Sequence, residues 1–117
     1  MTSVFSLLTV TVSRGVRMDD VGFTAKRTTI GSRCFLMVNA HVGHNCTVGD
    51  EVTIVNNGML GGHVEVAERA IIGANSAIHQ YCRVGRLAML SNMAGASVDV
   101  PPFFISMMTN TVTQLNA

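Results

Sequence analysis

The sequence predicts an all-β chain folded as a parallel β-helix of hexapeptide repeats, and three of its features support this. A large aliphatic residue recurs every six residues, a small or β-branched residue precedes it by two positions, and charged residues avoid both positions. Each repeat of such a solenoid buries its apolar face only by stacking on its neighbours. We expect one domain, residues 1–117, with about four regular coils over residues 28–102.

The six-residue step begins at Ile30 and continues without exception to Leu90. The aliphatic positions are Ile30, Leu36, Val42, Val48, Ile54, Leu60, Val66, Ile72, Ile78, Val84 and Leu90. The smaller positions two residues earlier are Thr28, Cys34, Ala40, Cys46, Val52, Gly58, Val64, Ala70, Ser76, Cys82 and Ala88. We expect both sets to face the interior. Three hexads then make one triangular coil, and the coils stack at the strand spacing of about 4.8 Å.

The composition agrees with this register. The chain is 48% hydrophobic and 13% charged, and it has no tryptophan, which suits a narrow core. An unpaired charge costs several kcal/mol when buried. The charged residues between 28 and 99 all fall on outward positions: Arg33, Asp50, Glu51, Glu65, Glu68, Arg69, Arg83, Arg86 and Asp99. The three cysteines are an odd number, which argues against a disulfide framework, and all take the small inward position.

Charge and hydropathy also argue against several classes of function. The net charge of +1 gives no general attraction for nucleic acid. The uncharged opening, residues 1–13, is too short to span a membrane and is interrupted by Ser and Thr. It also lacks a basic leader, which argues against a secretory signal. We therefore expect a cytoplasmic protein without a membrane span.

Residues separated by three hexads lie above one another in such a helix, so the register predicts corners of different chemistry. One corner collects most of the charge: Arg33, Asp50, Glu51, Glu68, Arg69 and Arg86. A second corner carries Asn39, Asn57 and Asn75. Asparagine tolerates the left-handed backbone that tight corners need, so we expect this second set to be structural.

The third corner collects all four histidines. His41, His44, His63 and His79 map to one short arc over three successive coils, and none takes an inward position. Outward histidines are not explained by packing, so this arc is the candidate functional surface. Several other outward positions are apolar, which predicts contact with a partner. A homotrimer, with the histidine side of each chain in a groove between subunits, is the expected assembly.

The ends of the chain depart from the repeat. We expect residues 1–27 to form an irregular coil, with a strand at Val10–Val12 and a loop over residues 15–27. The tail, residues 103–117, is uncharged and partly apolar, so we expect it to cap the last coil or to pack on a neighbour.

Four segments carry residues that the repeat itself does not require. They are MVNAHVGHNCTVGD (37–50), NNGMLGGHVEV (56–66), AIIGANSAIHQYCRVG (70–85) and DVPPF (99–103). Over roughly residues 10–110 the chain resembles the UDP-N-acetylglucosamine O-acyltransferases of lipid A synthesis. The resemblance implies a left-handed β-helix, assembled as a homotrimer, that moves a hydroxyacyl chain from acyl carrier protein to the 3-hydroxyl of a nucleotide sugar. It implies no metal or other cofactor, and it implies a chain shortened at both ends.

The same resemblance implies roles for particular residues. His44 matches the general base, which removes the proton of the sugar hydroxyl, and the backbone N–H of Gly62 matches the donor that steadies the thioester carbonyl. The substrate-binding positions are His41, His63, His79 and Gln80. Met89 and Asn92 match the region where the acyl chain ends. Some members of the family have glycine in place of Asn92, so the preferred chain length stays open.

Two departures from the family leave alternatives open. Asn45 follows His44 where the family usually has aspartate, and a neutral amide orients an imidazole without stabilising its charged form. The family's C-terminal nucleotide-binding region has no counterpart here. A catalytically impaired or inactive trimeric scaffold is therefore the second hypothesis. The third is a zinc site like that of β-helix carbonic anhydrases, although His41 and His44 are three residues apart rather than the expected five.

Overall fold

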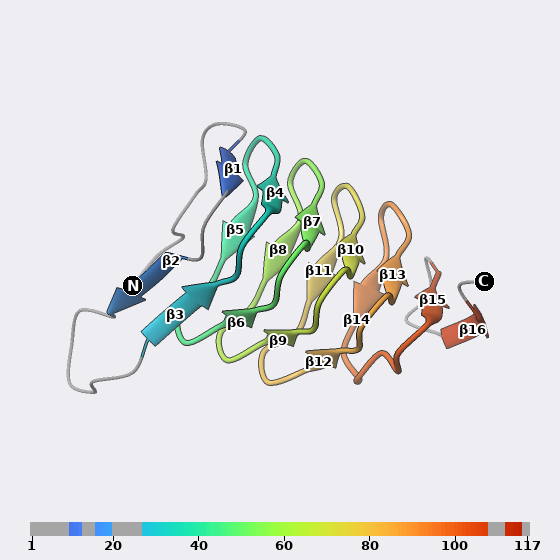
Figure 1. Ribbon diagram of the computed structural model, residues 1–117. Helices are drawn as coiled ribbons and strands as arrows, with labels where there is room; N and C mark the ends of the chain where they lie inside the picture. Colours follow the sequence, from blue (N-terminus) through green and yellow to red (C-terminus); the bar gives the residue numbers. More distant parts are fainter. Residues whose placement is uncertain (1–9, 13–15, 20–26, 108–111, 116–117) are drawn as a thin grey trace.

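The computed structural model describes residues 10–12, 16–19, 27–107 and 112–115, and these form short strands joined by tight corners (Figure 1). The strands are β1 (Val10–Val12), β2 (Val16–Asp19), β3 (Arg27–Ile30), β4 (Cys34–Leu36), β5 (His41–Val42), β6 (Thr47–Val48), β7 (Thr53–Ile54), β8 (Met59–Leu60), β9 (Glu65–Val66), β10 (Ile71–Ile72), β11 (Ala77–Ile78), β12 (Arg83–Val84), β13 (Met89–Leu90), β14 (Gly95–Ala96), β15 (Phe104–Ser106) and β16 (Val112–Leu115). Side chains are described for residues 27–107.

The strands form three sheets. Sheet A has the order β1-β4-β7-β10-β13-β15-β16, sheet B the order β12-β9-β6-β3-β2, and sheet C the order β14-β11-β8-β5. Within the regular coils each strand pairs in parallel with the strand three places further along the chain, so that Leu36 stands beside Ile54 of the next coil. Three strands and three corners therefore complete one coil, and the coils follow one another along a common axis (Figure 1). The predicted left-handed parallel β-helix is confirmed.

The predicted inward register is also confirmed. All eleven aliphatic positions from Ile30 to Leu90 are no more than 3% exposed. The smaller positions from Thr28 to Ala88 are buried as well. Two of the inward thiols satisfy their S–H groups on the next coil: Cys34 Sγ lies 3.1 Å from the carbonyl of Gly49, and Cys46 Sγ lies 3.0 Å from that of Gly61. Burial raises the pKa of the Cys34 thiol, so this side chain is a neutral core residue.

The corners have a common backbone geometry. Among the described residues, twelve other than glycine have φ between 54° and 66°, and eleven of them recur at six-residue intervals: Arg33, Asn39, Asn45, Glu51, Asn57, His63, Arg69, Asn75, Tyr81, Leu87 and Met93. Positive φ is unfavourable for most of these side chains. It is held by hydrogen bonds between coils, such as that from the N–H of Asn57 to the carbonyl of Val38 at 2.9 Å.

The corner that collects charge is held by ion pairs between coils. Glu51 lies 3.1 Å from Arg33 and 3.2 Å from Arg69, so it joins three coils, and Arg86 lies 3.1 Å from Glu68. These side chains are partly exposed, and such surface pairs contribute at most about 1 kcal/mol each. We call this part of the molecule the charge corner. It links sheet B to sheet A.

The first strands depart from the sequence expectation. Val10–Val12 is a strand, as predicted, but it runs antiparallel to β4. Residues 16–19, expected within a loop, instead form β2, which is antiparallel to β3. The reason is that no regular coil precedes β3 and β4 in the part of the chain that the structure describes, so the backbone groups along that edge need other partners. A reversed segment supplies them.

The last coil is shorter than the expected register. Val84 pairs with Val100 and Leu90 with Ser106, so each pair is closer in sequence than three full hexads. The regular step therefore ends at Ala96 and does not extend to residue 102. Asp99 stabilises the shortened coil, because its Oδ1 accepts the N–H of Arg83 at 2.8 Å and its Oδ2 pairs with the Arg83 guanidinium at 2.9 Å. The same backbone hydrogen bond lowers the pKa of Asp99.

Two described parts of the tail lie beyond this coil. Phe104 packs against the end of the core, and β16 covers β15 in antiparallel orientation. No helix with the length and apolar character needed to cross a membrane occurs among the described residues.

The inward register predicts opposite outcomes for two adjacent residues of similar shape in β6. Val48 is 2% exposed, whereas Thr47 is exposed on the outer face of sheet B. Val48→Ala removes two methyl groups from the packed column, and we expect a loss of about 2 kcal/mol in the free energy of unfolding. Thr47→Ala should change it by less than about 0.5 kcal/mol. Urea denaturation of both variants measures the difference, and equal losses would contradict the register.

Candidate functional site

The histidines gather at the corner that links sheet C to sheet B, as the register predicts. His44, His63 and Tyr81 come from three successive coils, at the ends of β5, β8 and β11. The rings of His44 and His63 meet edge to face, with 5.1 Å between centroids and planes at 89°. The rings of His63 and Tyr81 are stacked, with 4.5 Å between centroids and planes at 10°. We call these three side chains the ring ladder.

The imidazole of His44 is fixed at one of its two nitrogens. Its Nδ1 lies 2.8 Å from Oδ1 of Asn45. An amide oxygen only accepts hydrogen bonds, so this contact places the ring proton on Nδ1 and leaves a lone pair on Nε2. His44 is exposed, and Nε2 is therefore the atom of this residue that can remove a proton from a bound molecule.

Gly62 lies directly beneath the His44 ring, one coil further along the axis. A Cβ atom at Gly62 would lie 2.6 Å from both Cε1 and Nε2 of His44, a distance too short for any larger residue in this arrangement. The N–H of Gly62 donates to no described residue. The corner therefore presents an imidazole and, at the glycine next to it, a backbone N–H with no acceptor among the described residues, and acyl transfer uses groups of these two kinds.

Asn45 contributes one group without a partner. Its backbone N–H donates to Oγ1 of Thr28 at 3.0 Å, and its Oδ1 faces His44. Its Nδ2 is buried and has no hydrogen-bond partner among the described residues. An aspartate at this position would have an acceptor in place of that donor. Asn45 thus orients the His44 ring and leaves its own amide N–H unsatisfied.

The other predicted substrate-binding residues flank the ring ladder. His41 lies on the outer face of sheet C, opposite Met59 in the neighbouring strand, and burial lowers its pKa. His79 and Gln80 are exposed at the end of β11, where Nδ1 of His79 lies 3.2 Å from the carbonyl of Gln80. In the part of the chain that the structure describes, no group of three or more His, Cys, Asp or Glu side chains could hold a metal ion.

Met89 and Asn92 lie elsewhere. Met89 is a residue of β13 with its side chain on the outer face of sheet A, and Asn92 follows at the corner between sheets A and C. Oδ1 of Asn92 accepts the N–H of Ala74 at 2.8 Å. Sheet A is the side of the triangular coil opposite the histidine corner. Within a single chain these two residues therefore do not adjoin the ring ladder.

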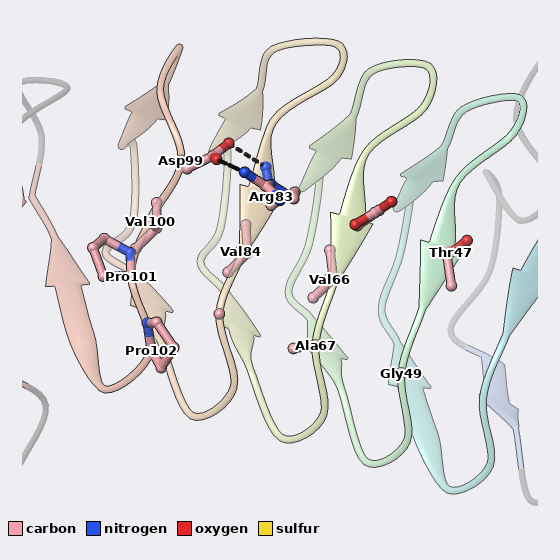
Figure 2. A pocket seen from close by; sticks show the side chains of 12 residues that line it. Thr47, Gly49, Val66, Ala67, Arg83, Val84, Asp99, Val100, Pro101 and Pro102 are labelled. Atoms are coloured by element: carbon pink, nitrogen blue, oxygen red, sulfur yellow. Dashed lines mark hydrogen bonds and ion pairs between the residues drawn. The ribbon is translucent and has the colours of Figure 1, made fainter.

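A hollow of about 590 Å³ lies on the outer face of sheet B (Figure 2). Val66, Ala67 and Val84 contribute to its apolar wall, with Pro101 and Pro102 from the shortened last coil. The ion pair between Arg83 and Asp99 lies on one side of it (Figure 2). No histidine lines this hollow, so it is separate from the ring ladder.

Tyr81 is the member of the site that the candidate residues omitted. It is the only tyrosine of the chain and stands one full coil after His63, so the register places the two side chains one above the other. Candidate residues chosen by their capacity to remove a proton do not include a phenol. The interval of three hexads between His63 and Tyr81 is the sequence signal that could have identified Tyr81 as part of the site.

Several known proteins are similar in sequence to this chain. Residues 27–62 match the family described as bacterial transferase hexapeptide (six repeats). An acyl-[acyl-carrier-protein]–UDP-N-acetylglucosamine O-acyltransferase of Burkholderia lata is 39% identical over 89 residues, 76% of this chain and 32% of the relative. One from Anaeromyxobacter sp. (strain K) is 45% identical over 76 residues, 65% of this chain and 30% of the relative. This chain is a hexapeptide-repeat relative of these O-acyltransferases.

Solved structures agree with the sequence comparison. LpxA from Acinetobacter baumannii superposes with a TM-score of 0.71 at 31% identity, over 74% of this chain and 34% of that one. The chain spans about a third of the length of the acyltransferases that it matches.

The close approach of the His44 ring to Gly62 can be tested by substitution of the glycine. In Gly62→Ala the added methyl group displaces the imidazole, because the ring is the movable partner of that contact. We expect shifted NMR resonances for His44 and unchanged far-UV circular dichroism. Gly95→Ala is the matched control, since a Cβ at Gly95 meets nothing within 4 Å. Unshifted His44 resonances in Gly62→Ala would contradict the described contact.

Proposed function

We propose that this protein is an O-acyltransferase in which His44 is the general base. It transfers an acyl chain from an acyl carrier protein thioester to a hydroxyl of a UDP-sugar. The observation that carries the proposal is the close approach of the His44 ring to Gly62, whose N–H donates to no described residue. The names of the relatives support the choice of substrates, because both include acyl-carrier-protein and UDP-N-acetylglucosamine.

The proposed reaction needs no group beyond these residues and the two substrates. Nε2 of His44 takes the proton of the sugar hydroxyl while the oxygen attacks the thioester carbonyl carbon. The negative charge that develops on the carbonyl oxygen is stabilised by the N–H of Gly62. The carbon–sulfur bond then breaks, an ester remains on the sugar, and the leaving thiolate takes the proton from the imidazolium. His63, His41, His79 and Gln80 surround this centre as substrate contacts.

A second chain completes the site in this proposal. Met89 lies on sheet A, on the far side of the coil from His44, and Asn92 lies at the corner between sheets A and C, so in this proposal a neighbouring subunit brings these residues to the ring ladder. Exposed apolar side chains such as Phe35 (37% exposed) and Met93 (61% exposed) suit such an interface. We propose that the protein is a homotrimer, and the mass of the assembly in solution tests this. We also propose that it is located in the cytoplasm together with the donor, acyl carrier protein.

The decisive experiment is a transfer assay with His44→Ala. The purified chain is incubated with hydroxyacyl carrier protein and UDP-N-acetylglucosamine, and the acylated sugar is measured by mass spectrometry. Loss of a general base lowers the rate by roughly 10²-fold or more. Glu68→Ala is the matched control, because Glu68 takes the equivalent hexad position at the charge corner. If the parent protein forms no product, or if His44→Ala equals the parent, the inactive scaffold is the better description.

Asn45→Asp is expected to increase activity. A carboxylate accepts the Nδ1–H of His44 as Asn45 does, and its charge also stabilises the imidazolium formed in the transition state. The change also removes the unsatisfied Nδ2 donor. We expect kcat to rise roughly tenfold, measured in the same assay, with Asn45→Ala falling below the parent. A lower kcat in Asn45→Asp than in the parent would contradict His44 as the base.

A further inference from the structure

We infer that Tyr81 is a positioning residue, which holds the imidazole of His63 and through it the imidazole of His44. The inference about ring geometry rests on contacts in this chain. Its kinetic consequence rests on the proposed function. Neither His63 nor Tyr81 forms a hydrogen bond through its ring or phenol to a described residue, so ring packing is the interaction that orients them.

The backbone places the three rings in one column. The N–H of Tyr81 donates to the carbonyl of Gly62 at 3.0 Å, and the N–H of His63 donates to the carbonyl of His44 at 2.9 Å. His63 and Tyr81 take the same left-handed corner conformation, with φ of 62° and 65°. Their side chains therefore leave successive coils in parallel directions, and the stacked contact follows from the coil spacing.

The stacked contact has a consequence for chemistry. A histidine that is held by a hydrogen bond uses one ring nitrogen for that bond. His63 is held instead by its ring contacts with Tyr81 and His44. Both of its nitrogens remain available to a bound substrate. The edge-to-face contact between His63 and His44 limits the rotation of the His44 ring about its hydrogen bond to Asn45. Tyr81 thus orients two imidazoles while making no hydrogen bond of its own to either ring.

Tyr81 is suited to a test because it is not a core residue. Its side chain is 67% exposed, so its truncation opens no cavity in the packed column. Leu87 is the matched control: it takes the same position in the next hexad, has φ of 58° and lies at the charge corner. An alanine at either position bears the same cost of a left-handed backbone. Tyr81→Phe retains the ring and removes only the hydroxyl.

The experiment compares Tyr81→Ala, Tyr81→Phe and Leu87→Ala with the parent. The NMR resonances of the imidazole C–H groups report the rings directly, since the ring current of Tyr81 acts on His63. We expect Tyr81→Ala to shift the resonances of both His63 and His44 and to lower kcat about threefold to tenfold. Tyr81→Phe should keep the parent resonances and rate, and Leu87→Ala should leave both unchanged.

The outcomes separate this inference from the proposed function. If His44 resonances in Tyr81→Ala match those of the parent, or if Tyr81→Phe behaves like Tyr81→Ala, the positioning role is wrong. If the parent is inactive in transfer, the proposed function fails, and the resonances alone decide the positioning role.

A second variant covers the case in which Tyr81→Ala does not fold. The chain has one tyrosine and no tryptophan, so its intrinsic fluorescence comes from Tyr81 alone. His63→Leu removes the stacked imidazole and should raise the emission of Tyr81. Unchanged emission would overturn the inference.

Discussion

The stacking of one coil on the next at a fixed interval of three hexads is the constraint on which the rest of this structure depends. It places each inward aliphatic side chain above another, as Leu36 stands beside Ile54, and it lets the backbone groups of each coil pair with those of the next. Burial and backbone hydrogen bonding are thus satisfied by the same interval. Corner residues accept a left-handed backbone that their side chains disfavour, because any other conformation would break the interval.

The same interval made most of the fold predictable from the sequence. The hexad period is repeated often enough to be recognised, although the small positions vary from Gly58 and Ser76 to Val52. Features that occur once could not be predicted in this way. The strand β2 forms because the first coil has an open edge, and the last coil is shortened at a corner stabilised by Asp99. Both depend on the ends of the stack, where no repeat is present to indicate the geometry.

The candidate site was predictable in position and less so in mechanism. The register places the histidines on one corner, but it does not state which atoms face each other. The tautomer of His44 depends on the direction of the Asn45 amide, and the approach of the ring depends on the missing side chain of Gly62. Tyr81 joins the site through stacking alone, a contact that leaves no motif. These contacts depend on the orientation of single side chains, which the repeat does not determine.

The triangular cross-section sets a limit on what one chain can do. A corner and the sheet opposite to it cannot approach each other, because the packed core fills the space between them. His44, Gly62 and the ring ladder are all at the corner between sheets C and B, whereas Met89 lies on sheet A. Under the proposed function, a single chain therefore activates a hydroxyl at His44, whereas its own sheet A cannot contact an acyl chain that is bound at that corner. Selectivity for the acyl group then depends on residues of a neighbouring subunit, whereas the proposed catalytic groups, His44 and Gly62, belong to one chain.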